Sequence, residues 1–309
     1  MVSQLCDGTL SRRQRGSRTE PPVESQAPLS LLEVLRRSTR HLAASGSETP
    51  RLDSELILAH ALQLDRIDLY VQFERPLGEA DLALIRPLLA ARAQGRPLAQ
   101  MVGRREFFGL DFAVDERVLI PRPESELLVE LAIRLQPEAE QAADLGSGSG
   151  CLGIAMAASL PQLRCDLVEL DPGAAAVASQ NVARHHLEAR VRVLEGSWAE
   201  PLGGLGPYQL LVSNPPYVTT SEWERLERSV RDFEPRRALD GGEDGLGPYR
   251  ELLPQLPGVA APGATILLEG DPRRLGALER LAQEVLGEVA TARHLDLTGR
   301  ERVLEVRLP

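Results

Sequence analysis

The sequence predicts an α/β protein with a seven-stranded, mostly parallel sheet, preceded by a small helical domain and a β-hairpin linker. Strand-like and helix-like segments alternate from Ala142 to the end of the 309-residue chain, as βαβ units do. Only the turn sequence "TGRE" separates the last two strand-like segments, which predicts an antiparallel C-terminal hairpin. Helical periodicity without strand signals fills the region from Leu29 to about residue 96.

Residues 1–28 are predicted to form a disordered N-terminal tail. They carry four arginines among Ser, Gly and Pro and show no apolar periodicity. Organellar transit peptides share this Arg- and Ser-rich composition. Asp7, Glu20 and the lack of an amphipathic helix argue against organellar targeting.

Residues 29–96 are predicted to form a helical substrate-recognition domain of three helices. Ser30 and Glu33 have the spacing of a capping box at the start of the first helix. Pro50 suits the first position of the second helix, and the third is expected to be disturbed near Pro87. No polar cluster suited to catalysis lies here, so we expect a binding or orienting role.

Short alternating stretches with glycine punctuation predict a β-hairpin linker over residues 97–121. A helix begins within "PRPESELLVELAIRL" and opens the remaining domain, residues 122–309. Its strands are expected at 142–146, 164–170, 191–196, 208–214, 264–270, 290–297 and 302–308, and its helices near 151–159, 173–186, 221–228, 246–256 and 273–286.

Composition and charge exclude several functional classes. Hydrophobic residues make up 43% of the chain, but no apolar run approaches the ~18 residues that span a membrane. The net charge of −10 opposes stable binding to nucleic acid phosphates. The three cysteines and five histidines lack the spacing of a disulfide framework or a metal site. These features are typical of a cytoplasmic, metal-free protein.

A glycine-rich loop follows the first strand of the sheet. "DLGSGSGCLG" places an acid at the strand end and three glycines before a helix, as in nucleotide-type loops. It is not a P-loop, and a cysteine replaces the third glycine of the dinucleotide fingerprint. A tight turn without a ligand is the alternative interpretation. The candidate cofactor-binding residues of the loop are Asp144, Gly146, Ser147, Gly148, Ser149 and Gly150.

An acid after the next strand suits a ribose. Glu169 lies 23 positions after Gly146, near the ~20 expected for an acid that bonds ribose hydroxyls. Asp171 is the alternative, but it is better placed to cap the following helix. S-adenosylmethionine has ribose and adenine but no phosphate, so it suits this short loop, with Asp144 facing its amino-acid end. Trp198, after the third strand, either stacks near the adenine or packs on a helix.

The fourth strand ends in "NPPY", residues 214–217, which is either a polar turn or a grip on a planar substrate. Together with the glycine loop and Glu169, this motif resembles class I S-adenosylmethionine-dependent methyltransferases, which implies a Rossmann-like fold. Within that class, NPPY is typical of enzymes that methylate a planar nitrogen, either adenine N6 or glutamine N5.

Three further stretches, at residues 105–130, 233–252 and 296–306, resemble the HemK/PrmC family, and the resemblance covers about residues 29 to 308. It implies methyl transfer from S-adenosylmethionine to the glutamine N5 in the Gly-Gly-Gln (GGQ) motif of peptide chain release factors, which modulates translation termination, by a monomeric enzyme. The chain departs from the family at Ser125, where Thr is commoner, at Ser197, where Asp is common, and in "LEGDPRR".

The resemblance also implies roles for the catalytic and substrate-binding motif. The carbonyls of Asn214 and Pro215 would accept the two hydrogens of the substrate amide, and Asn214 is also a candidate cofactor-binding residue. Pro215 and Pro216 fix the backbone, and Tyr217 would cover the amide face. The alternatives are an adenine-N6 methyltransferase acting on nucleic acid, which the acidic charge opposes, and a non-catalytic cofactor-binding module.

Three residues of the 233–252 stretch stay open between two roles. Phe233, Glu234 and Tyr249 either line the substrate side or order the loop. Arg122 and Glu124 are candidates to bridge the two domains, although Glu124 also suits a helix start.

Overall fold

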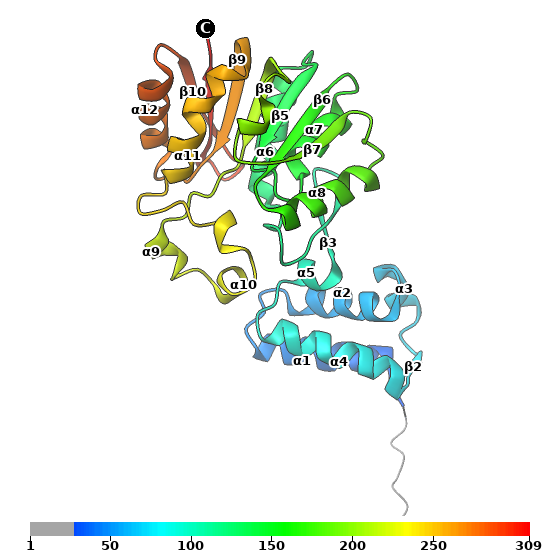
Figure 1. The fold of residues 1–309 in the computed structure, drawn as a ribbon. Helices are drawn as coiled ribbons and strands as arrows, with labels where there is room; N and C mark the ends of the chain where they lie inside the picture. The colour runs from blue at the N-terminus through cyan, green and yellow to red at the C-terminus, as the bar shows by residue number, and fades with distance from the viewer. Residues whose placement is uncertain (1–27) are drawn as a thin grey trace, which may run out of the picture.

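The computed structural model describes residues 28–309, and Figure 1 shows a helical N-terminal lobe joined to a larger α/β lobe. Apart from Pro28, the predicted N-terminal tail lies outside the described residues.

The N-terminal lobe contains the three expected helices and some smaller elements. These are β1 (Leu29–Ser30), α1 (Leu31–Ala44), α2 (Pro50–Leu62), α3 (Arg66–Val71), β2 (Pro76–Leu77) and α4 (Glu79–Ala93). The predicted capping box at Ser30 is present, because the Glu33 amide donates to Ser30 Oγ at 3.3 Å and the Ser30 amide donates to Glu33 Oε2 at 3.0 Å. The short helix α3 and the β1–β2 pair were not expected.

Helix α4 continues through Pro87, contrary to expectation. The proline removes one backbone hydrogen bond, but neighbouring side chains on both sides of it pack into one apolar core. Ile85 is buried there, and Leu88 and Leu89 pack against it. Tertiary packing therefore outweighs the local cost of the proline, about 3 kcal/mol.

The linker contains the expected hairpin. It follows a short helix, α5 (Leu98–Val102), that was not expected, and consists of β3 (Arg104–Phe107) and β4 (Leu110–Ala113). Phe108 and Gly109 both have positive φ, 51° and 74°, as a tight two-residue hairpin turn requires.

The α/β lobe is built on the predicted seven-stranded sheet. Its strands are β5 (Gln141–Leu145), β6 (Arg164–Glu169), β7 (Val191–Glu195), β8 (Tyr208–Ser213), β9 (Ala260–Glu269), β10 (Ala290–Leu295) and β11 (Glu301–Arg307). The order is β10-β11-β9-β8-β5-β6-β7, and β11 alone runs antiparallel to the other six strands. The mostly parallel sheet and its antiparallel C-terminal hairpin are thus confirmed.

Two apolar clusters cover the two faces of this sheet. One involves α6 (Glu126–Leu135), which follows the 3-10 turn η1 (Pro123–Ser125), together with α7 (Cys151–Ser159) and α8 (Pro172–Arg184). The other involves α11 (Gly247–Leu252), η4 (Leu253–Gly258) and α12 (Leu275–Leu286).

Two predicted helices are shorter than expected. The segment 221–228 forms two single turns, α9 (Thr220–Trp223) and α10 (Arg228–Arg231), and the segment 246–256 tightens into η4 after α11. Two prolines in η4, Pro254 and Pro257, explain the second change, because they cannot donate helical hydrogen bonds.

The chain reverses direction beside β5. It runs from β5 outward to β6 and β7, and then returns to place β8 on the other side of β5. Such a switch point leaves a crevice at the carboxyl ends of the strands, where doubly wound sheets bind ligands. The fold therefore brings the loops after β5, β6 and β8 together.

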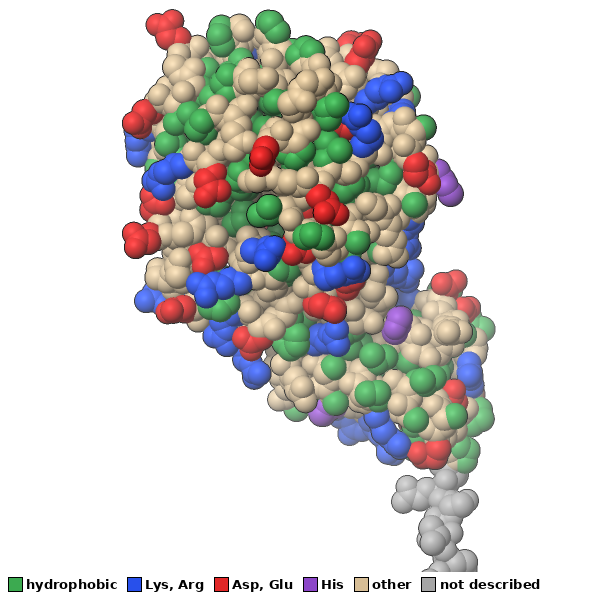
Figure 2. Space-filling view, in the orientation of Figure 1, with side chains coloured by type: hydrophobic (Ala, Val, Ile, Leu, Met, Phe, Trp, Pro, Cys, Tyr) green, Lys and Arg blue, Asp and Glu red, His purple; other side chains and the backbone are tan. Residues whose placement is uncertain are grey.

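The surface mixes charges of both signs. In Figure 2 basic side chains gather between the two lobes, over the segment that carries α9 and α10. In the part of the chain that the structure describes, no helix has the length and apolar character needed to cross a membrane. Residues 28–309 also contain no cluster of His, Cys, Asp and Glu suited to a metal ion.

Candidate active site

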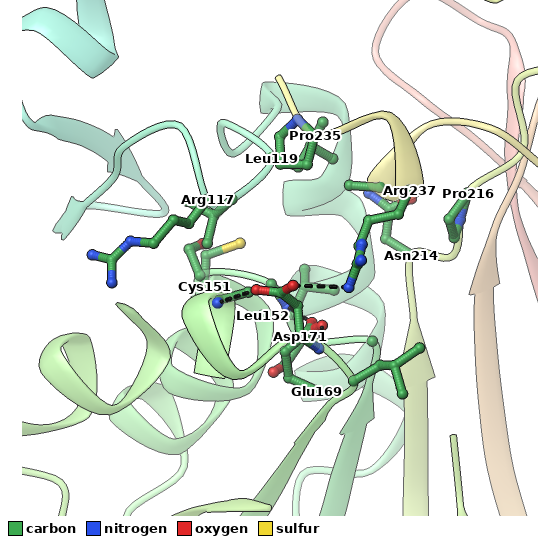
Figure 3. Close-up of a pocket in the computed structure, with 18 of the residues that line it drawn as sticks. Arg117, Leu119, Cys151, Leu152, Glu169, Asp171, Asn214, Pro216, Pro235 and Arg237 are labelled. Carbon is green, nitrogen blue, oxygen red and sulfur yellow. Dashed lines mark hydrogen bonds and ion pairs between the residues drawn. The ribbon is translucent and has the colours of Figure 1, made fainter. Parts of the chain in front are cut away.

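A cavity of about 200 Å³ lies at the switch point (Figure 3). Its wall comes from the glycine loop, from the loops after β6, β7 and β8, from the end of the linker with η1, and from residues 235–238. Segments that lie far apart in the sequence thus meet around one space. Most of the predicted site residues are in its wall, namely Gly146, Ser147, Gly148, Ser149, Glu169, Trp198, Asn214 and Pro216.

The three glycines of the loop have different roles. All have positive φ, 76° at Gly146, 55° at Gly148 and 78° at Gly150. A Cβ on Gly150 would lie 2.9 Å from Leu167, so this position allows α7 to pack closely on β6. A Cβ on Gly148 would meet nothing within 4 Å. The backbone at Gly148 is therefore accessible from the cavity, whereas Gly150 lies outside the cavity wall.

Asp144 is fully buried behind the loop and does not contribute to the cavity wall. Its Oδ2 accepts a hydrogen bond from the Gly153 amide at 3.0 Å, in the first turn of α7. Burial raises the pKa of Asp144 to about 7; the Gly153 amide opposes this shift, and the Glu169 charge adds to it. In this arrangement Asp144 holds the start of α7, and it does not face the cavity as the sequence led us to expect.

Glu169 holds the glycine loop and faces the cavity. Its Oε2 accepts from the Gly148 amide at 2.7 Å, and its Oε1 accepts from the Asp171 amide at 2.9 Å. Asp171 caps α8, as expected, by accepting from the Ala174 amide at 3.0 Å. Between the two acids, Glu169 is therefore the one with a carboxylate tied to the glycine loop.

Trp198 lies over the start of the glycine loop. A Cβ on Gly146 would be 3.3 Å from the Trp198 ring, and the indole Nε1 donates to Glu251 at 3.1 Å. Its φ of 48° is unusual for a bulky side chain. The ring both contributes to the cavity wall and is held by a residue of α11. Stacking on adenine stays a prediction.

The NPPY segment divides between the cavity and the core. Asn214 and Pro216 lie in the cavity wall, whereas Pro215 and Tyr217 do not. Asn214 Nδ2 donates to Ser125 Oγ at 3.0 Å, which leaves the Asn214 carbonyl oxygen for another partner. The Tyr217 hydroxyl donates to Glu269 Oε1 at 3.3 Å, and burial raises the pKa of Tyr217, so that its hydroxyl stays neutral.

The cavity wall contains arginines that the sequence did not single out for this role. Arg117 pairs with Asp115, Arg122 with Glu234 and Arg237 with Asp171, the last at 2.8 Å (Figure 3). Isolated arginines in loops resemble solvated surface residues, so no sequence signal distinguishes them. Cys151 also lines the cavity, but burial raises its pKa to about 12, and its thiol is therefore not a nucleophile near neutral pH.

The open question on the 233–252 stretch is answered for two of its residues. Glu234 is buried, accepts from the Ile120 amide at 3.0 Å and pairs with Arg122 at 2.6 Å. Tyr249 is buried, and its hydroxyl donates to the backbone carbonyl of Glu269 at 2.5 Å. Both residues order the loop. Through its backbone carbonyl, Phe233 accepts from Gln100 of α5 at 2.8 Å, which ties the loop to the N-terminal side.

The wall suits S-adenosylmethionine better than a phosphate-bearing cofactor. Each of its three arginines already has a carboxylate partner, so the described wall offers no unpaired cation to a phosphate. Glu169 provides an acceptor for ribose hydroxyls. Ser147 Oγ is buried without a hydrogen-bond partner within residues 28–309, so it has capacity left for a ligand.

Comparison with known proteins gives a consistent result. Residues 33–103 match the model of the PrmC N-terminal domain, and residues 123–230 match that of the methyltransferase small domain. The solved catalytic domain of hMettl16, in complex with the MAT2A 3′UTR hairpin 6, is 18% identical with a TM-score of 0.52, and the match covers 72% of this chain and 84% of that one. At this identity the structural likeness shows the fold alone.

Sequence relatives cover nearly the whole chain. It is 46% identical to the release factor glutamine methyltransferase of Geobacter sulfurreducens, over 78% of this chain and 84% of the relative. The enzyme of the same name from Rhodopirellula baltica is 36% identical, over 92% of this chain and 98% of the relative. The chain therefore belongs to the release factor glutamine methyltransferase family.

Proposed function

We propose that this enzyme transfers a methyl group from S-adenosylmethionine to the side-chain amide nitrogen, N5, of the glutamine in the Gly-Gly-Gln motif of peptide chain release factors. Family membership supports the activity and the methyl donor. The observation that carries the proposed site is the orientation of Asn214, whose amide group is used by Ser125 while its carbonyl remains available.

Methylating an amide nitrogen demands careful positioning. The nitrogen lone pair is delocalised into the carbonyl, so the amide is a weak nucleophile. A site that accepts both N–H groups turns the lone pair toward the methyl donor and gains strength as the nitrogen becomes pyramidal. The side-chain carbonyl of Asn214, in the cavity wall, is the first acceptor that we propose. The second is the backbone carbonyl of Pro215, the next residue, whose ring is buried outside that wall. Such positioning contributes up to about 7–11 kcal/mol in favourable cases.

The cofactor would be held by the glycine loop, Glu169 and Trp198. When bound, S-adenosylmethionine supplies an electrophilic methyl group on a sulfonium. The Glu169 carboxylate would orient the ribose part, the glycine loop with its unpartnered Ser147 hydroxyl would orient the amino-acid part, and Trp198 would cover the adenine.

No general base is needed before the transfer. The substrate nitrogen would become acidic only once it carries the methyl group, and it would then lose one proton to solvent. In agreement, no histidine lies in the described cavity wall, and the Cys151 thiol stays protonated.

A methyl-transfer assay tests the proposed function. Methyl-labelled cofactor is incubated with the enzyme and a release factor that carries either Gly-Gly-Gln or Gly-Gly-Ala. We expect label on the first substrate only. Label on the Ala variant, or only on DNA or RNA added in a parallel reaction, would overturn the proposal.

The same proposal describes a cytoplasmic monomer that binds a protein substrate and not nucleic acid. The net charge of −10 supports the proposal that the enzyme does not bind nucleic acid, because it would repel the phosphates. Light scattering of the enzyme alone, and a gel-shift assay with labelled RNA, test the two parts separately.

A further inference from the structure

Glu269 is a buried acid beside the NPPY segment that has no role in the transfer described above. It ends β9, and the register pairs Ser213 of β8 with Leu268 of β9. The next residues, Asn214 and Glu269, therefore leave the two neighbouring strands together. Only 1% of Glu269 is exposed, and its Oε2 makes no hydrogen bond of normal geometry within residues 28–309. Burying a carboxyl away from water costs free energy unless hydrogen bonds or a charged partner compensate for the lost hydration.

The neighbours of this carboxyl reach both ends of the NPPY segment. On one side the Tyr217 hydroxyl donates to Glu269 Oε1 at 3.3 Å. On the other side is Ser125, itself only 3% exposed, which lies close enough to lower the Glu269 pKa although no hydrogen bond of normal geometry joins the two side chains. Ser125 Oγ accepts from Asn214 Nδ2 at 3.0 Å. A path from Asn214 through Ser125 to Glu269 is completed if Ser125 turns its hydroxyl hydrogen toward Oε2, the oxygen that has no partner in the described residues.

The direction of hydrogen bonding along this path decides which way Asn214 faces. An ionised carboxylate only accepts hydrogen bonds, whereas a serine hydroxyl donates one and accepts others. If Ser125 gives its hydrogen to Glu269, its lone pairs remain for an N–H donor. Asn214 must then turn its NH2 group toward Ser125 and its carbonyl toward the substrate.

A neutral partner at position 269 removes this constraint. A protonated acid or a carboxamide can donate to Ser125, whose hydroxyl is then free to donate to the Asn214 carbonyl. The Asn214 side chain would flip and present its NH2 group to the substrate NH2, and two donors cannot bond each other.

We propose that Glu269, acting through Ser125, is a positioning residue that fixes the Asn214 carboxamide with its carbonyl toward the acceptor nitrogen. It also orders the Tyr217 hydroxyl, so that one buried carboxylate aligns both polar ends of the NPPY segment. The inference rests on the proposed function, because it concerns how the same site grips an amide.

A pH dependence follows from this arrangement. Burial raises the pKa of Glu269 to about 7. The groups that face it are Arg302 of β11, which lowers this pKa, Glu124 of η1, which raises it, the hydroxyls of Ser125 and Tyr217, and Tyr249 and Cys151, whose own raised pKa values keep them neutral. As pH falls through about 7, Glu269 gains a proton and Asn214 is no longer fixed, so kcat should fall.

The test uses the full chain with a release factor substrate and three variants. Glu269→Gln keeps the shape and allows donation to Ser125. Ser125→Ala removes the hydroxyl, and Ser125→Thr retains it as the matched control. For each we would measure kcat, KM for the release factor, cofactor affinity by calorimetry and the thermal midpoint.

We expect Glu269→Gln and Ser125→Ala to lower kcat by about 10- to 100-fold, the loss seen when residues that orient metal ligands are mutated. Ser125→Thr should stay within about threefold of the wild type, and cofactor affinity should change little in all three. The fall in wild-type kcat below about pH 7 should be absent in Glu269→Gln, because its carboxamide does not titrate.

Three results would overturn the inference. Glu269→Gln could retain wild-type kcat. It could lose kcat only in proportion to cofactor affinity and thermal stability, which would indicate a structural role. Or its kcat could keep the acidic fall, which would assign that titration to Asp144, the other carboxyl with a pKa near 7. A wild-type enzyme that fails to methylate the Gly-Gly-Gln substrate would instead count against the proposed function.

Discussion

At the level of single residues, the two ends of the Asn214 carboxamide have different partners. Its amide group donates to Ser125, while its carbonyl oxygen makes no hydrogen bond in the described residues and is left for a substrate in the cavity that both residues line. Cofactor contacts, in contrast, are expected from the glycine loop and Glu169 on the other side. Turnover and cofactor binding should therefore respond differently to substitutions on the two sides.

Asn214→Ala tests this separation. We expect it to abolish measurable turnover, because one of the two acceptors for the substrate amide is lost, while most of the cofactor affinity remains. Calorimetry with the cofactor and a methyl-transfer assay measure the two effects. A large loss of cofactor affinity would show that Asn214 mainly holds the cofactor.

Asp144 gives a prediction about stability and pH. Its pKa is about 7 in the folded chain against an ordinary value of 3.8. The folded state therefore holds this proton more tightly than the unfolded state does. The resulting stabilisation is complete below about pH 4 and is lost as pH rises through about 7.

Asp144→Asn should reduce the fall in thermal midpoint between about pH 5 and pH 8, because the amide cannot ionise. Glu269, whose pKa is also about 7, contributes with the same sign, so part of the fall should remain. Thermal unfolding at a series of pH values measures this. An unchanged slope would mean that Asp144 is ionised throughout this range.

Residue chemistry predicted the site unevenly. Spacing and residue type were enough to place Glu169, Gly146 and Gly148 at the cavity, because a strand end followed by a helix start fixes where they lie, but Gly150 lies outside the cavity wall. The same reasoning misplaced Asp144, since the direction of a side chain at a strand end depends on how α7 packs. Ser125 and Glu269 became visible as partners of the NPPY segment only once η1, β8 and β9 were brought together.

At the level of elements, the NPPY turn is held by a second backbone segment. The Gly241 amide donates a backbone hydrogen bond of 2.7 Å to the Val218 carbonyl. A Cβ on Gly241 would lie 2.7 Å from the Pro216 carbonyl oxygen and 2.9 Å from Tyr217 Cα. These are backbone atoms, so they cannot move aside as a flexible side chain would.

Gly241→Ala should therefore shift the NPPY turn and lower kcat about tenfold or more, since small displacements at a reacting centre are costly. Gly258→Ala is the matched control, because a Cβ there would meet nothing within 4 Å. Steady-state kinetics of both variants measure the effect. Equal kcat values for Gly241→Ala and Gly258→Ala would show that the close backbone contacts at Gly241 do not position the NPPY turn.

The elements that sequence periodicity predicted best are the buried strands and the long helices beside them. It was least reliable between β8 and β9, where the expected helix at 221–228 is two short turns. That segment is held by specific contacts, such as the Trp223 ring under Arg236 at 4.2 Å, and such contacts leave no periodic signal. The unbroken α4 shows the converse, because core packing overrode a local proline signal.

For the molecule as a whole, a few contacts connect the linker and N-terminal side to the loop over the cavity. Glu234 pairs with Arg122 and accepts a hydrogen bond from the Ile120 amide. Gln100 donates to the backbone carbonyl of the neighbouring Phe233. The Glu234 side chain is 1% exposed, whereas that of Arg122 is 32% exposed. The loop that helps to form the cavity wall is thus coupled to the segment that we expect to recognise substrate.

Arg122→Ala should weaken this coupling. It leaves a buried carboxylate without its charged partner, which costs a few kcal/mol in buried pairs, although solvent around Arg122 reduces the amount. We expect a lower thermal midpoint and a raised KM for the release factor. The exposed pair of Arg86 and Glu79 gives the control, since Glu79→Gln should change stability by less than about 1 kcal/mol. Similar effects of the two variants would argue against the coupling.

The proposed substrate site at Asn214 and Pro215 consists of two hydrogen-bond acceptors and contains no donor. Both acceptors are satisfied only by a substrate nitrogen that carries two hydrogens. A primary amide supplies two, and the methylated product supplies one. After one transfer an acceptor is left facing a methyl group, which disfavours rebinding and a second round. The enzyme should therefore stop at a single methyl group, even with excess cofactor and long incubation, and intact-mass analysis of the release factor would show this directly.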